Sequence, residues 1–357
     1  MNPTEIVNAF GHSDALGRLE DLPAEYVRAI HALSVAPLWP QLRGLLPRDL
    51  PARRTLPFAW HYRDLRAHLL RAGELTPIEK AERRVLVLCN PGHGLDKLVA
   101  TPTIYVGLQL ILPGEVAPNH RHTPTAVRFV IEGRGGYTTV NGEKCPMDQG
   151  DLILTPALNW HEHGHEGAEP VIWLDALDLP MIYAMEASYA IEGPRQLTGD
   201  APDASQTHYR RAGLLPYASL AQARRAEYPQ IRYPWRDVRE ALGALAAVTP
   251  RGEAVQLAYV NPETGRSCVP TLGFSAQLLR AGHDCSPRRR SASGVIHVVE
   301  GQGESLIDGV ALAWSQGDTV AVPTHAQVTH RAQGKDAYLF HIDDAPMQRA
   351  LGIYEDF

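Results

Sequence analysis

The sequence predicts a mainly β protein built from two jelly-roll β-barrels, with a partly helical N-terminal arm and a helical linker. Two observations carry this prediction. Short apolar or alternating runs, separated by Gly, Pro, Asn and Asp, fill two parts of the chain, and the same landmarks recur in both. We expect the arm to cover residues 1–95, the first barrel 96–184, the linker 185–250 and the second barrel 251–357.

The first 95 residues have the pattern of short helices. Apolar residues recur at spacings of three and four in 25–42, 63–73 and 76–88, which is typical of amphipathic helices. Prolines at 37, 40, 47, 51 and 57 would divide the region into short pieces.

The first barrel is predicted from strand-like runs at 104–115, 126–143, 150–156 and 171–179. Asn141-Gly142 is a strong signal for a two-residue hairpin turn. The linker returns to helical patterns at 217–228 and 235–248. Strand patterns resume at 271–282, 294–309, 317–324 and 337–343, which predict the second barrel.

An internal repeat relates the two strand-rich parts. Residues 113–133 match 281–301 at a constant offset, and 150–163 match 317–330 at an offset that is one residue shorter. Both copies contain a strand that ends in Glu-Gly, followed by Gly-Asp and a further strand. The sequence therefore predicts two copies of one β-domain.

Composition limits the possible classes of function. The formal net charge of the 357 residues is −6, which argues against a protein that binds nucleic acid through phosphate electrostatics. No apolar run reaches the roughly 20 residues of a membrane span, and the N-terminus lacks the pattern of a secretory signal. The four cysteines form no CxxC pair, which favours free thiols and a cytoplasmic protein.

Histidines indicate a metal site in the first repeat. Five of the 16 fall in two groups, His120/His122 and His161/His163/His165. On an extended backbone, His120 and His122 face the same side, and His161 from a second strand can complete a three-imidazole set. Such a set suits Zn²⁺, Fe²⁺, Mn²⁺ or Ni²⁺, and the spacing does not choose among them.

The second repeat lacks these ligands. Its equivalent positions hold Arg288, Arg290 and Val328, and guanidinium does not bind metals because it stays protonated. We expect the second barrel to be metal-free and mainly structural. The basic run Arg288–Arg290 fits a solvated or ion-paired face better than a phosphate or nucleic-acid site.

Other residues of the first repeat are candidates for substrate binding and catalysis. Arg128 lies in an apolar strand, where it would meet a substrate carboxylate or a protein acid such as Asp175. Strand alternation places Tyr105, Gly107 and Gln109 on one face, which would offer an aromatic wall, a gap for a planar ring and an amide. Two further roles are acid–base chemistry at His163 and orientation of a neighbour by Asp175.

The spacing of these residues resembles the two cupin motifs. Gly114, His120, His122 and Gly133 fit the first motif, and Gly150, Pro156 and His161 fit the second. Leu158 stands where the second motif usually has Gly. Ala126 stands where many cupins place a ligating Glu, so the site would have no carboxylate ligand.

Residues 113–133, 155–167 and 81–92 make the resemblance more specific. They resemble the bicupin ring-cleaving dioxygenases that act on gentisate, salicylate and 1-hydroxy-2-naphthoate. The resemblance implies Fe(II) bound by His120, His122 and His161, with an aromatic hydroxy acid and O₂ as substrates. It also places Arg84 as a second pocket arginine beside Arg128, matches Gln109, His163 and Asp175, and suggests a homotetramer.

Gentisate, opened to maleylpyruvate, is the preferred substrate. Tyr105 replaces a Trp of the salicylate-active member, which argues against monohydroxylated rings. Salicylate and 1-hydroxy-2-naphthoate remain alternatives with the same chemistry. A metal-dependent cupin isomerase or hydrolase, and a non-catalytic binding or storage bicupin, are more distant alternatives.

Overall fold

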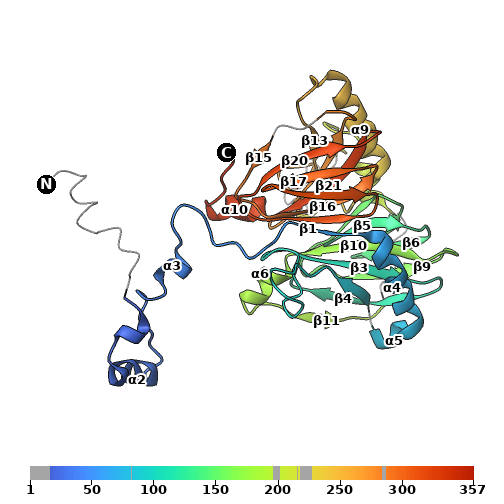
Figure 1. Cartoon of the computed structure of the whole chain (residues 1–357). Coiled ribbons are helices and arrows are strands. Elements are labelled where there is room, and N and C mark those ends of the chain that lie inside the picture. The colour runs from blue at the N-terminus through green and yellow to red at the C-terminus, as the bar shows by residue number, and fades with distance from the viewer. Residues whose placement is uncertain (1–16, 82, 196–201, 215, 218–226, 284–286) are drawn as a thin grey trace. The chain divides into compact units, whose positions relative to one another are not determined.

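The computed structural model describes residues 17–81, 83–195, 202–214, 216–217, 227–283 and 287–357 (Figure 1). It divides the chain into two compact units, residues 1–54 and 55–357. The described part of the first unit is helical and contains η1 (Leu19–Asp21), α2 (Ala24–Ala32) and α3 (Leu42–Leu45). None of the helices in the described residues has the length and apolar character that a membrane crossing needs.

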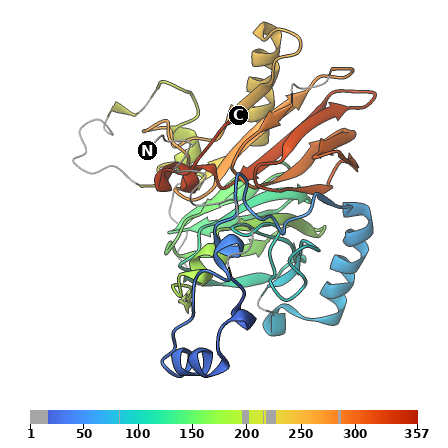
Figure 2. The ribbon, with the colours of Figure 1, turned by 60° about the vertical axis from the view of Figure 1, so that its left-hand side comes forward.

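The second unit contains two β-barrels, each made of two sheets (Figure 2). In the first barrel a six-stranded sheet has the order β12-β8-β5-β10-β3-β2 and faces a five-stranded sheet of order β11-β4-β9-β6-β7. The six strands are β12 (Arg232–Tyr233), β8 (Leu152–Thr155), β5 (Ala126–Glu132), β10 (Val171–Leu177), β3 (Tyr105–Ile111) and β2 (Arg84–Val87). The five are β11 (Ala190–Glu192), β4 (Val116–His122), β9 (His161–His165), β6 (Gly136–Val140) and β7 (Glu143–Met147).

The second barrel repeats this topology. Its six-stranded sheet has the order β1-β19-β16-β21-β14-β13, and its smaller sheet the order β15-β20-β17-β18. The large sheet is formed by β1 (Phe58–Trp60), β19 (Thr319–Val322), β16 (Gly294–Glu300), β21 (Ala337–Asp343), β14 (Gly273–Leu279) and β13 (Val255–Ala258). The small one is formed by β15 (Arg288–Arg289), β20 (Gln327–Ala332), β17 (Gln302–Ile307) and β18 (Val310–Ser315). Strand by strand, the order confirms the predicted duplication and the bicupin fold.

Most predicted elements are present, and one was assigned wrongly. The Asn141-Gly142 turn joins β6 and β7, with φ of 47° and 89° at its two central residues, as a type I′ turn requires. Residues 76–88 were predicted as one helix, but the helix α5 (Ile78–Ala81) ends early and 84–87 form β2, whose valines suit a strand paired with β3. Most of the predicted helix 217–228 lies outside the described residues, as does Cys285. The remaining three cysteines are free.

In each barrel, one edge of the large sheet is formed by a strand from a distant segment of the chain; the first barrel also takes the edge strands β2 and β11 from outside the predicted range 96–184. β1, from the arm before the first barrel, pairs with β19 of the second barrel, and β12, from the linker, pairs with β8 of the first. The registers are equivalent, since Trp60 lies opposite Thr319 and Tyr233 opposite Leu152. The strands of the first barrel therefore extend beyond the predicted range 96–184.

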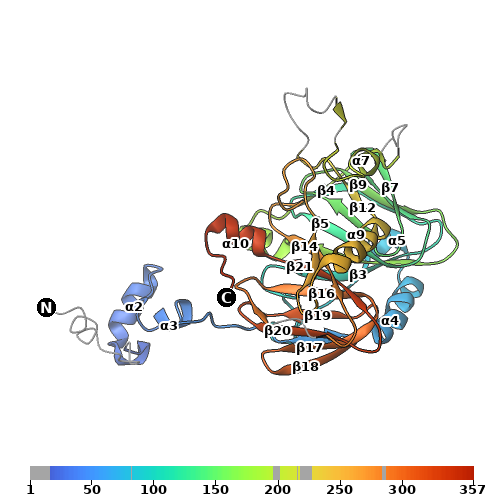
Figure 3. The same ribbon diagram turned by 90° about the horizontal axis from the view of Figure 1, so that it is seen from above.

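A 14-residue helix follows each exchanged strand: α4 (Tyr62–Leu75) after β1 and α9 (Trp235–Val248) after β12 (Figure 3). The first backbone amide of each helix donates to a carboxylate of the Gly-Asp pair that marks the repeat. Tyr62 N lies 2.8 Å from Asp318 Oδ1, and Trp235 N lies 2.9 Å from Asp151 Oδ1. A carboxylate at a helix N-terminus satisfies an unpaired N–H and interacts favourably with the helix dipole. The Gly-Asp landmark is therefore a helix-capping site.

The large sheets of the two barrels share one hydrophobic core. The rings of Phe129 from β5 and Phe340 from β21 stack at 4.2 Å, and both side chains are fully buried. Because side chains alternate across a strand, Phe129 faces the second barrel while its neighbour Arg128 faces the interior of the first. The interior has an apolar end, which includes Val130, Ile153 and Trp173, and the candidate site lies beyond it.

Candidate metal centre and adjoining pocket

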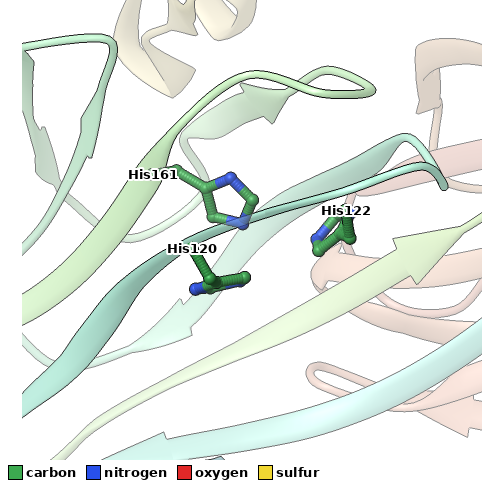
Figure 4. A group of neighbouring side chains, drawn as sticks. All are labelled: His120, His122 and His161. Atoms are coloured by element: carbon green, nitrogen blue, oxygen red, sulfur yellow. The ribbon is translucent and has the colours of Figure 1, made fainter. Parts of the chain in front are cut away.

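Three histidines from two neighbouring strands lie together inside the first barrel. His120 and His122 come from β4 and His161 from β9, as Figure 4 shows. Their candidate ligand atoms lie within 4.8 Å of one another, and the strand register pairs His120 directly with His161. The i, i+2 spacing on an extended strand therefore places His120 and His122 on the same side, and one ion could contact all three rings.

Backbone carbonyls set the tautomer of each imidazole. The Nδ1 atoms of His120, His122 and His161 lie 2.8, 2.7 and 2.9 Å from the carbonyl oxygens of Pro118, Pro124 and Asn159. A carbonyl only accepts, so each Nδ1 carries the proton and each Nε2 presents a lone pair. The Nε2 atoms of His120 and His161 are buried without a hydrogen-bond partner. Such unsatisfied acceptors are what a metal site requires before the ion binds.

Electrostatics keep these rings neutral. Burial lowers the pKa of His120 to about 3, and the neighbouring Arg83 contributes in the same direction. Burial likewise lowers the pKa of His122 to about 4 and that of His161 well below its usual value, with Arg128 as the next cause for His161. Neutral imidazole is the ligand form, so the site is ready to bind a metal at neutral pH without releasing protons.

The two departures from the cupin motifs have visible structural counterparts. Ala126 is buried on β5, and the three-histidine group contains no carboxylate among the described residues. Leu158 adopts a left-handed conformation, with φ of 60°, at the position where the motif usually has Gly. Its backbone N–H donates to the carbonyl of His122 at 2.8 Å, which ties the loop before His161 to the strand of the other two ligands.

Arg128 is buried next to the histidines. Its Nη1 donates to Thr155 Oγ1 at 2.6 Å, and its Nε lies 3.5 Å from Asp175 Oδ1. Burial lowers the pKa of Arg128 to about 10, although the charge of Asp175 opposes this shift. Burial also raises the pKa of Asp175, while Arg128 and a hydrogen bond from Trp173 oppose that change. Both interpretations of Arg128 thus have support. It pairs with the protein acid Asp175, and it also has N–H donors that these contacts do not use and that a substrate carboxylate could accept from.

Arg84 points away from the histidines, which differs from the expectation drawn from the sequence. It pairs with Glu115 and reaches the carbonyls of Gly73 and Thr76 near the C-terminal end of α4. The physical reason is strand alternation. Val85 pairs with Gln109 on β3, so Arg84 points to the opposite face of the sheet.

Arg83 is the second arginine near the site, and sequence reasoning missed it. Its charge contributes to lowering the pKa of His120, His122 and His163, and it is half-buried. A strand pattern over 84–87 would have indicated it, because Arg83 and Val85 are two residues apart and therefore lie on the same face of a strand. The helix predicted for 76–88 does not place them in this way.

Tyr105, Gly107 and Gln109 lie on one face of β3, as predicted. The register places Gly107 opposite Asp175 and Gln109 opposite Trp173 on β10. A Cβ at Gly107 would come within 2.4 Å of Val85 Cγ1 and 2.9 Å of Tyr105 Oη, so glycine leaves room for the tyrosine ring. The Oε1 atom of Gln109 is buried without a hydrogen-bond partner, which makes it an available acceptor.

His163 lies one strand repeat beyond His161, and it is fully buried. The ring centroids of the two are 5.6 Å apart, and Nδ1 of His163 lies 2.9 Å from Thr138 Oγ1. Its Nε2 has no hydrogen-bond partner. Burial, followed by the charge of Arg128, lowers the pKa of His163 well below its usual value. At neutral pH this residue is an uncharged imidazole.

The second barrel places its equivalent residues in the same register. Arg288 pairs with Val328, as His120 pairs with His161. Arg288 and Arg290 form ion pairs with Asp356 and Asp343, and the Arg289 guanidinium lies over the Phe357 ring. These contacts confirm the ion-paired interpretation of the basic run.

Comparisons with known proteins agree with this geometry. Residues 107–177 match the family described as Cupin domain. The chain is 51% identical to a gentisate 1,2-dioxygenase from Ralstonia sp, over 96% of this chain and 97% of the relative. It is 37% identical to a 5-aminosalicylate 1,2-dioxygenase from Comamonas sp, over 90% and 87%. The crystal structure of salicylate 1,2-dioxygenase from Pseudoaminobacter salicylatoxidans, described as an adduct with gentisate, superimposes with a TM-score of 0.87 at 32% identity and covers 94% of both chains.

Proposed function

Because this chain belongs to the gentisate 1,2-dioxygenase family of ring-cleaving cupin dioxygenases and acts on gentisate, we propose that it does so with Fe(II) bound by His120, His122 and His161. The proposed product is maleylpyruvate, formed by opening the ring between the carbons that bear the carboxylate and the adjacent hydroxyl. The observation that carries the proposal is the set of neutral imidazoles whose Nε2 atoms converge beside a buried arginine.

The donor set fits ferrous iron. Three neutral imidazoles leave the full charge of a divalent ion uncompensated, and three ligands leave further coordination positions open. When bound there, iron would hold both the hydroxy acid and dioxygen and allow electron density to pass between them. The carbonyls of Pro118, Pro124 and Asn159 support this role, since each fixes one ring in the ligating tautomer.

Arg128 is the proposed anchor for the substrate carboxylate. A carboxylate that enters this part of the barrel leaves water, and a charge-assisted pair with the buried guanidinium offsets the cost of its desolvation. Asp175 compensates Arg128 only in part at 3.5 Å, while Thr155 holds one nitrogen of the fork. The anchored carboxylate would fix which edge of the ring faces the histidines.

The remaining pocket residues have proposed roles in positioning the ring. Gly107 and Tyr105 would form one side of the ring slot, and Gln109 would accept a hydrogen bond from a ring hydroxyl. His163 is proposed to accept or return a proton at Nε2, because its Nδ1 is occupied by Thr138. Arg83, rather than Arg84, is the proposed second cation at the pocket.

Salicylate and 1-hydroxy-2-naphthoate remain alternative substrates for the same chemistry. Gentisate is preferred because its para hydroxyl donates electron density to the ring and eases attack by oxygen. Tyr105, which fills the slot beside Gly107, supports a ring with more polar substituents, since its hydroxyl can bond to one.

Oxygen consumption with a panel of the three acids tests the substrate proposal. The enzyme, loaded anaerobically with Fe(II), should take up one O₂ per gentisate and form a product with the absorbance of maleylpyruvate. Its kcat/KM for salicylate should be at least tenfold lower. Metal analysis in parallel should show one iron per chain, and full activity with Zn²⁺ in place of iron would contradict the proposed cofactor.

Two further proposals concern the protein in the cell. A cytoplasmic location is supported by the free thiols of Cys89, Cys145 and Cys268. A homotetramer is supported by the first unit, which exposes large apolar side chains that include Leu33, Leu45 and Leu46. Sedimentation of the full chain, and of a chain that begins at Thr55, tests whether this unit carries the contacts.

A further inference from the structure

The second barrel contains a cavity at the position that the three-histidine group has in the first. Its volume is about 430 Å³, which is within the range of small-molecule sites. Gln277 and His330 lie in it at the repeat positions of Gln109 and His163. The loss of metal ligands in this barrel has therefore left a pocket rather than a filled core.

One end of this cavity presents hydrogen-bond donors. Trp314 Nε1, which can only donate, lies 2.9 Å from Ser305 Oγ, and the same oxygen lies 2.8 Å from His330 Nδ1. Ser305 is buried, so its own proton is best placed toward His330 Nδ1. That arrangement makes His330 Nε2 an N–H donor. Burial lowers the pKa of His330 to about 4, so the ring stays neutral and keeps this donor at neutral pH.

The same end of the cavity carries positive charge. Arg290 lines it, with one nitrogen 3.1 Å from Asp343 and its side chain 27% exposed. A guanidinium has five N–H donors, and the contact with Asp343 uses only part of them, so Arg290 can also bind a second anion. Arg288 lies at the same side of the cavity and pairs with Asp356.

Apolar side chains form much of the remaining wall, which also contains the polar side chains of Gln256, Gln277 and His341 and the carboxylate of Glu253. Ile296 occupies the repeat position of Arg128, and Val328 occupies that of His161. The charge distribution is therefore reversed relative to the first barrel. The cation lies at the position of the candidate metal ligands. In the sheet that carries Arg128 in the first barrel, the cavity is lined by the apolar Ile296 and by His341, whose Nε2 donates to Gln277 Oε1 at 2.9 Å.

We propose that the second barrel is a non-catalytic binding site for one small aromatic carboxylate. The carboxylate would bind at Arg290 and His330, and the ring would lie between Ile296, Val328 and the neighbouring apolar residues. An aliphatic acid would use the donors but would leave the broad apolar wall unfilled, so an aromatic acid fits the cavity better. No oxidation takes place here, because the histidine ligands are replaced.

Anaerobic equilibrium dialysis of the iron-loaded full chain with gentisate tests this site. Without O₂ there is no turnover, and the wild type should bind two molecules of gentisate per chain. Val328→Trp, which fills the cavity, should bind one. Arg290→Gln should weaken the second binding event at least tenfold, whereas Arg289→Gln, whose side chain lies over Phe357, should leave it unchanged.

Oxygen consumption by each variant separates this proposal from the proposed function. Val328→Trp should retain the wild-type rate, which also shows that it folds; if it does not fold, Arg290→Gln and Arg289→Gln decide the question. The site does not exist if the wild type binds a single molecule of gentisate. It is also excluded if two molecules bind to folded Val328→Trp, or if Arg290→Gln and Arg289→Gln bind alike.

Discussion

Nε of Arg128 and Oδ1 of Asp175 lie 3.5 Å apart on adjacent strands, both buried, at a separation longer than a good hydrogen bond. Asp175 is held more closely by Trp173, whose indole N–H donates to it at 3.0 Å. Asp175 thus stabilises the charge of the buried Arg128 but leaves some of its N–H donors free to bind another anion. This is the state expected of an arginine that must also bind a substrate anion.

Replacing Arg128 should damage catalysis and spare the metal. In Arg128→Ala we expect a higher KM, a lower kcat and a fall of about 100-fold in kcat/KM, since a charged hydrogen-bond partner of a buried anion is worth about 1.5–3 kcal/mol. Steady-state kinetics with gentisate and iron analysis measure the two effects. Arg134→Gln, at an exposed position in the turn between β5 and β6, is the control. Loss of iron from Arg128→Ala would mean that the residue is structural.

Removing one imidazole should empty the metal site. We expect His120→Ala to bind less than about 0.1 iron per chain, because two neutral ligands do not retain the ion against solvent. His165→Gln is a matched control on β9, where the native ring bonds only to its own loop through Gly167 and Glu169. Iron content by atomic emission decides the outcome, and wild-type stoichiometry in His120→Ala would overturn the ligand assignment.

The capping carboxylates should be important for stability. Asp151 is 2% exposed, and it accepts hydrogen bonds from the Trp235 amide and from Arg232. Asp151→Ala leaves a buried guanidinium with one partner fewer, so we expect a loss of about 3–5 kcal/mol in the free energy of unfolding. Asp148→Ala, at a nearby exposed position, should cost less than about 0.5 kcal/mol.

Asp318→Ala extends this comparison to the second barrel, because Asp318 caps α4 as Asp151 caps α9. Measured by chemical denaturation, the losses in the free energy of unfolding of Asp151→Ala and Asp318→Ala should agree within a factor of two. A large loss in one barrel alone would contradict the equivalence of the two contacts.

Acid should destabilise the protein through its buried neutral histidines. His297 is buried, its Nδ1 lies 3.1 Å from Thr319 Oγ1, and burial lowers its pKa to about 4. Between pH 6.5 and 4 the unfolded chain binds a proton that the folded chain does not, so stability falls as the pH falls through this window. At one pKa unit per 1.36 kcal/mol, His297 accounts for a loss of about 3 kcal/mol by pH 4.

His297→Gln isolates this contribution. The variant should lose less stability than the wild type between pH 7 and pH 4.5, as measured by denaturant midpoints at both values. His208→Gln, at an exposed position, should follow the wild type. Equal pH dependence in the wild type and His297→Gln would show that His297 is not buried in the neutral form.

The three-histidine group was predictable because its geometry is local. His120 and His122 are two residues apart on one strand, and the Gly-Asp landmark fixed the distance in sequence to His161. The position of Arg84 was predicted wrongly for an equally local reason. Residues 76–88 have apolar spacing that fits a helix, while their valines, paired with β3, form a strand. A shift of one residue along a strand reverses the face, and this is why Arg83, rather than Arg84, is the proposed second cation beside the histidines.

The pairing of the exchanged strands was hard to predict from the sequence. β1 and β12 are only three and two residues long, and their partners lie far away along the chain. One signal was overlooked: YRDLR at 62–66 resembles WRDVR at 235–239, and both segments begin a capped helix. The repeat therefore includes the strand and helix that precede each barrel, although these were assigned to an arm and a linker.

The exchange of β1 and β12 also bears on how this protein can evolve. A gene shortened to the metal-binding half would encode a sheet with an open edge and no partner for the buried ring of Phe129. Loss of the half that lacks the three-histidine group should therefore be selected against, because the fold of the other half depends on it. Substitutions among the residues that line the cavity of the second barrel can give new ligand specificities without affecting the reaction in the first barrel.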